Sequence, residues 1–251
     1  MKDAKLAIGV GKRLAGLRKE RHIQMIDVAL ELNISPSQYS RIENGKQSLS
    51  VDAVKKICEF YKCSIDYIIL GEKNTVSSVF FRKLDGLSEM EKRRYLKILY
   101  YLMHGSRHAR ISKYDTMHKL FGEGLLETIP GDATNTMPYV LEFEKNRQRI
   151  SENVMIEDLH LTRYKWESIK SGLKISDMTI PLDIMKKYGY DLGFLMKNEI
   201  EESMFFDDIY RELDNREKEN TMKAFDYILN LENGEQAVVE VQKVKTSKPF
   251  D

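Results

Sequence analysis

Residues 33–50, NISPSQYSRIENGKQSLS, hold a group of hydrogen-bonding side chains at helical spacing. Ser37 and Arg41 are four residues apart, so both lie on one side of a helix, with Gln38 at its flank. Side chains of these types donate and accept several hydrogen bonds, so this face of the helix suits a partner other than the protein's own core. The alternative, for an isolated segment, is a polar helix face that contacts only water.

The helix that carries these residues has clear signals at both ends. Ser35 is a good N-cap, and Gln38, three residues later, completes a capping box. Gly45 suits the position just past the helix, where a left-handed backbone conformation is common. Tyr39 and Ile42, three residues apart, point inward. Because only these two large apolar side chains are buried, the opposite face of the helix is left for a partner.

Four more helices are expected around this one, from apolar spacing and from start and stop signals. They span residues 8–21, 24–32, 51–61 and 64–70. Five short helices in about 65 residues, with a tight turn between the second and the third, predict a helix-turn-helix domain.

The stretch 11–72 resembles the Cro/CI-like (XRE) family of phage repressors. Residues 42–46, Ile-Glu-Asn-Gly-Lys, and residues 65–69, Ile-Asp-Tyr-Ile-Ile, carry the likeness together with the spacing of the whole domain. The resemblance implies a lambda-repressor-like fold whose third helix, residues 35–44, enters the DNA major groove with its N-terminal end leading. It also implies a double-stranded DNA operator as partner, with the polar residues named above as base readers.

The resemblance further implies phosphate contacts and an internal brace. The candidate phosphate-binding residues are Gln24, Ser35, Asn44 and Lys46. Arg18 and Glu43 are implied to form a structural ion pair between the first helix and the end of the third. Two positions depart from the family pattern. Family members usually carry a phosphate-binding glutamine at the position of Met25, for which the neighbouring Gln24 is a substitute, and Pro36 stands where some members place a base-reading glutamine.

The chain also resembles itself. Residues 150–174 match the first helix-turn-helix at an offset of 127, and residues 202–234 match residues 77–105. Ile150, Ile156, Leu161, Thr162, Trp166, Ile169 and Gly172 stand opposite Ile23, Ala29, Ile34, Ser35, Tyr39, Ile42 and Gly45. A repeat of this length predicts an all-α chain of two tandem five-helix lambda-repressor-like helix-turn-helix domains, each followed by a helical hairpin.

The repeat sets the expected domain boundaries. They are 1–72 for the DNA-binding domain, 73–105 for a hairpin, 106–138 for a linker with a short helix near 114–121, 139–199 for a degenerate second domain, 200–234 for its hairpin and 235–251 for a tail.

The second copy differs from the first where DNA chemistry would lie. Glu152 stands where the family needs a phosphate donor, and a carboxylate there would repel phosphate. Lys145 and Lys170 replace the arginine–glutamate brace. These changes favour a copy that does not read bases, whereas Arg163 and Lys165 favour one that does, and both alternatives stay open.

Charge is uneven along the chain. Residues 82–120 hold ten Lys/Arg against four Asp/Glu, whereas residues 140–234 hold fourteen against twenty. The front half is therefore the better candidate for a polyanionic partner.

A broad apolar stripe in residues 87–103 predicts a packing surface for another module or subunit. Its candidate dimerisation residues are Met90, Tyr95, Ile98, Leu99 and Leu102. A homodimer is expected because one helix-turn-helix reads only a half-site. The alternative is that the stripe forms an ordinary core within its own module.

Composition limits the remaining classes. The 251 residues are 42% hydrophobic and 31% charged, with a formal net charge of +1, so two globular domains are expected. Two cysteines, Cys58 and Cys63, indicate a reducing compartment, and no apolar run reaches the roughly 18 residues of a membrane span. A cytoplasmic protein without membrane contact is expected.

Signals for enzyme chemistry are weak. His104, His108 and His118 are not joined by a carboxylate or a cysteine at metal-binding spacing, and Gly9-Val-Gly-Lys-Arg lacks the full phosphate-loop pattern. No cofactor, metal or catalytic residue is expected. The sequence favours a sequence-specific DNA-binding transcriptional regulator, a dimeric repressor. The alternative is a protein-interaction module, antirepressor-like or antitoxin-like, with a regulatory protein or peptide as its partner.

Overall fold

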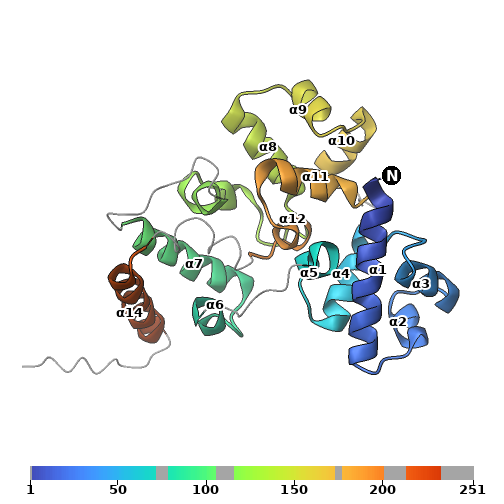
Figure 1. Cartoon of the computed structure of the whole chain (residues 1–251). Helices are drawn as coiled ribbons and strands as arrows, with labels where there is room; N and C mark the ends of the chain where they lie inside the picture. Colours follow the sequence, from blue (N-terminus) through green and yellow to red (C-terminus); the bar gives the residue numbers. More distant parts are fainter. Residues whose placement is uncertain (1, 72–78, 106–115, 173–176, 201–212, 233–251) are drawn as a thin grey trace, which may run out of the picture.

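The computed structural model describes residues 2–71, 79–105, 116–172, 177–200 and 213–232 (Figure 1). Within these ranges every regular element is helical and none is a strand, which confirms the expected all-α class. No helix in the described ranges is both long and apolar enough to cross a membrane.

The first five helices form one compact group, called here the first unit. They are α1 (Lys2–Glu20), α2 (Met25–Glu31), α3 (Pro36–Glu43), α4 (Val51–Tyr61) and α5 (Ile65–Leu70). Serine side chains cap the starts of α3, α4 and α5 by accepting a hydrogen bond from the backbone three residues later. Each of these helices therefore begins where its N-cap serine satisfies otherwise unpaired N–H groups.

A second group of five helices, called here the second unit, follows in the same order of elements. It comprises α8 (Met137–Gln148), α9 (Glu152–Asp158), α10 (Arg163–Lys170), α11 (Thr179–Tyr188) and α12 (Leu192–Lys197). The bounds of α9, α10 and α12 lie 127 residues after those of α2, α3 and α5. Left-handed backbone recurs at the same offset, at His22 and Arg149, Asn33 and His160, Gly45 and Gly172, Lys62 and Gly189, and Gly71 and Asn198.

Three further helices and two short turns complete the described chain. They are α6 (Val79–Lys83), α7 (Glu89–His104) and α14 (Asn215–Glu232), with a π-helical turn at His118–Gly122 and a 3-10 turn at Leu125–Thr128. The helix α7 packs along α14. Residues 201–212 of the second expected hairpin and the expected tail from residue 235 lie outside the described residues.

The segment expected to be a linker is packed into the protein from Thr116 onward. Met117, Leu120 and Leu125 are fully buried, so residues 116–129 do not behave as a solvated connection. The expectation of a linker over 106–138 is wrong for this part, because its apolar side chains fill the space between α7 and α8. Residues 106–115 are outside the described ranges.

Two hydrophobic cores organise the molecule. The first core is that of the first unit, and four residues of the second unit also belong to it: Met178, Leu182, Leu192 and Met196. The second core joins α7, α14, the packed segment and all five helices of the second unit, including Ile184 of α11 and Phe194 of α12. The helices α11 and α12 therefore contribute side chains to both cores, and the two units are joined through them.

Candidate nucleic-acid interface

The start of α3 is fixed by a reciprocal capping box. The Ser35 hydroxyl accepts from the Gln38 backbone N–H at 3.2 Å, and the Gln38 side-chain oxygen accepts from the Ser35 backbone N–H at 3.0 Å. Pro36 occupies the first turn, where its missing N–H leaves no donor unpaired. The capping box therefore fixes the direction and the first turn of α3.

The two sides of α3 differ as the spacing predicts. Tyr39 and Ile42 are 0% and 4% exposed and belong to the first core. Ser37, Gln38 and Arg41 are all exposed on the outer side. The structure thus brings the three candidate base readers together on one accessible surface.

The three candidate base readers differ in how many of their hydrogen-bonding groups are already used within the described residues. The Ser37 hydroxyl lies 2.9 Å from that of Ser35, and the Gln38 oxygen is used by the capping box. No hydrogen bond or ion pair joins Arg41 to another described residue, and its guanidinium extends from an exposed position. Arg41 is therefore the reader with all of its donors available, since a guanidinium carries five of them.

A bidentate ion pair holds α3 against α1. The Arg18 Nε lies 2.6 Å from Glu43 Oε1, and its Nη2 lies 3.0 Å from Oε2. The side chains are only 12% and 6% exposed. The hydrogen bonds to Glu43 raise the pKa of Arg18 above its ordinary value. This is the brace that the family resemblance implies, and it lies behind α3, away from the reading surface.

Close backbone packing supplies a second brace, which the sequence reading did not identify. A Cβ atom at Gly11 in α1 would lie 2.4 Å from the Glu43 carbonyl oxygen, which is nearer than real atoms pack. Gly45 has a φ of +67°, and a Cβ there would lie 2.7 Å from the Ile8 Cα. The helices α1 and α3 can approach this closely only because both positions are glycine. The sequence signal for this close contact is Gly11, a glycine inside the apolar pattern of a helix.

Two of the four candidate phosphate contacts already form hydrogen bonds at the two ends of α3. The Asn44 Nδ2 donates to the Ser40 carbonyl at 2.7 Å, and the Ser35 hydroxyl takes part in the cap of α3. Gln24, at the start of α2, and Lys46, just past α3, have exposed side chains. Gln24 and Lys46 are consequently the better placed of the four to meet a DNA backbone.

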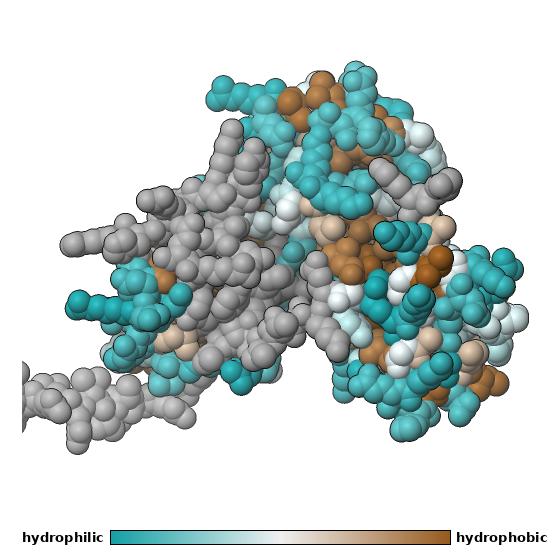
Figure 2. Space-filling model, viewed as in Figure 1, coloured by the Kyte–Doolittle hydropathy of each residue, from teal (hydrophilic) through white to brown (hydrophobic). Residues whose placement is uncertain are grey.

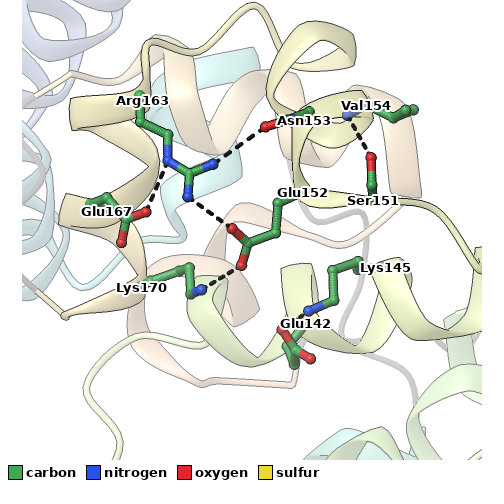
Figure 3. Close-up of polar contacts among 9 residues, drawn as sticks. All are labelled: Glu142, Lys145, Ser151, Glu152, Asn153, Val154, Arg163, Glu167 and Lys170. Carbon is green, nitrogen blue, oxygen red and sulfur yellow. Dashed lines mark hydrogen bonds and ion pairs between the residues drawn. The ribbon is translucent and has the colours of Figure 1, made fainter.

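The equivalent surface of the second unit is a closed network of charges (Figure 3). The Glu152 carboxylate contacts Lys170 and, at 3.3 Å, the Arg163 guanidinium. The Arg163 Nε also lies 3.1 Å from Glu167 Oε1. The hydrogen bond from Lys170 is the main reason that the pKa of Glu152 is lowered. These four charged groups of α9 and α10 thus neutralise one another.

The remaining candidate donor of the second unit is also paired. Lys165 contacts Asp177 at 2.5 Å. Lys145, at the place of the bracing arginine, contacts Glu142 of its own helix instead of α10. A Cβ atom on Gly172 would meet nothing within 4 Å. Neither brace of the first unit therefore recurs in the second.

The candidate dimerisation residues divide between the inside and the outside of the chain. Tyr95 and Leu99 are 3% and 1% exposed, and the ring of Phe225 in α14 stacks edge-on against Tyr95 with centroids 6.3 Å apart. Their assignment to a contact with a second chain is corrected, because α14 of the same chain already covers this face. Met90 is 75% exposed, and Ile98 and Leu102 are half-buried.

Comparison with known proteins agrees with the geometry of the first unit. A family model described as helix-turn-helix matches residues 14–68. Antitoxin PezA of Streptococcus pneumoniae serotype 4 (strain ATCC BAA-334 / TIGR4) is 31% identical over 91 residues, which cover 36% of this chain and 56% of that protein. The chain thus matches about half the length of this relative. No solved structure matches the chain. Residues 14–68 therefore form a helix-turn-helix domain of the XRE family, as the sequence resemblance predicts.

Proposed function

We propose that this chain is a sequence-specific regulator of transcription that reads the DNA major groove with α3. The observation that carries the proposal is the exposed Arg41, whose guanidinium has no described partner, on a helix held by two braces. Such a helix is preorganised, so little order is lost when it docks in a groove. The XRE domain supports DNA binding, and repression of transcription is the form of regulation that the resemblance favours.

Homodimerisation on a two-fold operator stays a prediction of the family resemblance, and the number of chains bound per duplex decides between it and binding by a single chain. The exposed part of α7, with Met90 at its start and the half-buried Ile98 and Leu102, is the part left for it. Tyr95 and Leu99 contribute only within the chain.

A second candidate function is binding to a protein partner. The similar protein PezA is named an antitoxin, which favours an antitoxin-like role for part of this chain. Because the charges on α9 and α10 neutralise one another, their surface is also suited to binding a partner other than DNA. Loss of partner binding without loss of DNA binding, on changing the second unit, would separate this function from the first.

Replacing Arg41 with alanine is expected to weaken specific DNA binding by about 1–3 kcal/mol, the value of one bidentate base contact. It should also relax the preference at one position of the site. The measurement is a titration against a duplex selected from a random pool, followed by the same titration with each base pair varied. Unchanged affinity and preference would refute the assignment of α3 as the reading helix.

Lys46→Ala provides the matched control. Because Lys46 is expected to meet phosphate, its loss should weaken binding to all duplexes alike, and the slope of log K against log salt should fall by about one contact. A change in base preference on removing Lys46 would contradict its place on the backbone.

A further inference from the structure

We propose that the second unit takes the place of a second subunit. One chain alone is then the DNA-binding species, and it reads a single half-site. The DNA part of this inference rests on the proposed function. The intrachain part rests on the contacts between the two units.

The two halves of the chain meet through equivalent helices. The helix α5 packs against α12, its counterpart at the offset of 127, and α7 packs against α14, the last helix of the second half. In a two-fold dimer each subunit uses the same surface patch, so a helix meets its own copy across the axis. Two such pairs in one chain indicate an internal two-fold arrangement.

The contact between α5 and α12 is apolar and fully closed. Leu192 and Met196 of α12 are both 0% exposed and share the first core with Ile65 and Ile69 of α5. Leu192 is the counterpart of Ile65, and Met196 is the counterpart of Ile69. Counterpart side chains thus share a single core, as they do in a contact between identical subunits.

Counterpart segments lie on the two flanks of this contact. On one side, the Lys55 Nζ of α4 donates to the Thr134 carbonyl at 3.2 Å. On the other side, Met178 and Thr179 at the start of α11 line a cavity of about 150 Å³ together with Ala7. The helix α11 is the counterpart of α4, and Thr134 is the counterpart of Ala7. Figure 2 shows hydrophobic surface where the two units adjoin on this side of the molecule.

In the second pair of helices, α14 covers the apolar stripe of α7. Phe225 packs on Tyr95, and Lys83 of α6 forms an ion pair of 2.6 Å with Asp226 of α14. Arg93 of α7 donates to the Asn198 carbonyl, at the end of α12, at 2.9 Å. The surface that a second chain would have covered is therefore occupied by this chain's own second half.

The two units differ in whether the cations on their third helix are paired with carboxylates. In Figure 1, α3 and α10 lie toward the right-hand side of the view, whereas α5 and α12 meet nearer the middle. On α3 the Arg41 guanidinium is exposed and has no described partner, whereas Arg163 and Lys165 of α10 are held by carboxylates. A single chain thus carries one reading helix and one unit that fills the partner's place, which fits an asymmetric site.

The experiment measures stoichiometry and connectivity on the full chain. Sedimentation of the chain on a duplex selected from a random pool should show an added mass of one chain, 29.3 kDa, and a footprint with one recognised segment. A lysine-reactive crosslinker should join Lys55 to Lys197, because the Lys197 Nζ lies 3.6 Å from Glu59 Oε1, one turn along α4 from Lys55. With light and heavy isotope-labelled chains mixed, this crosslink should form only within a chain.

Two chains per duplex would overturn the proposal in favour of the homodimer. Mixed light–heavy Lys55–Lys197 crosslinks would overturn it in favour of exchange of the second unit between chains. If no duplex is selected, the proposed DNA function and the one-chain reader fail together, while the crosslinks still decide whether the second unit occupies the partner's place.

Discussion

Replacement of Glu144 with leucine is expected to destabilise the folded chain by about 3–5 kcal/mol, although the surroundings are largely apolar. Glu144 is 0% exposed, and its carboxylate lies 3.0 Å from the Nζ of Lys119, which is 2% exposed. The Tyr190 hydroxyl donates to the same carboxylate at 2.8 Å. Without Glu144, the ammonium of Lys119 keeps the Tyr188 carbonyl at 2.8 Å and the Tyr190 ring, whose centroid is 4.9 Å from Nζ, but no carboxylate among these groups compensates its charge.

The loss of stability caused by Glu144→Leu should become smaller as the pH rises. Burial lowers the pKa of Lys119, and Glu144 acts against this lowering. In the variant the folded lysine binds fewer protons than the unfolded one between its lowered pKa and about pH 10, so stability rises with pH across that window. Urea unfolding of Glu144→Leu should therefore show a smaller deficit at pH 9 than at pH 7.

The double variant Lys119→Met with Glu144→Leu is the matched control. Replacing both buried charges by apolar groups of similar volume is often neutral or stabilising, so most of the lost stability should return. Equal deficits in the single and double variants would show that the uncompensated charge is not the cause.

This buried pair also marks the limit of the sequence reading. Glu144 lies 127 residues after Leu17, a core residue of the first unit, and nothing in the local pattern shows that a carboxylate there is buried. Its partner lies in the segment expected to be a linker. A hydrophobic pattern predicts which side of a helix is buried, but it does not tell which distant side chain lies beneath it.

Helix positions were predictable where capping chemistry is local. Ser35, Ser50 and Ser64 each accept the hydrogen bond that starts a helix, and the helices expected at 51–61 and 64–70 agree with α4 and α5 to within one residue. These signals need only neighbouring residues, so the sequence contains them in full.

Long-range polar contacts were not predictable in the same way. Arg13 lies off the apolar stripe of α1, as a solvated arginine would. In the structure it donates to the carbonyls of Ile68 and Ile69 at 2.7 Å, in the last turn of α5. Likewise, the stripe of α7 was recognised, but only the fold shows that α14 covers it. Periodicity identifies an apolar face and leaves its partner undetermined.

The largest expected effect on DNA binding comes from the double variant Ser37→Ala with Arg41→Ala, which should largely abolish specific binding. Both side chains are exposed on α3, and the arginine alone accounts for about 1–3 kcal/mol of base discrimination. The two braces of α3 involve neither residue, so the fold should persist. Binding to the selected duplex is the measurement, with thermal unfolding as the check that the domain is intact.

The equivalent change in the second unit, Arg163→Ala with Lys165→Ala, should leave affinity for the same duplex within about 0.5 kcal/mol, the usual size of a neutral surface change. Arg163 contacts Glu152 and Glu167, and Lys165 contacts Asp177, so phosphate would have to displace carboxylates that these cations already meet. Removing the cations also exposes unpaired carboxylates, which repel DNA, so a small loss is expected and not a gain. Equal losses from the two double variants would mean that both units read DNA, and that ion pairs on an exposed helix yield to phosphate more easily than their geometry indicates.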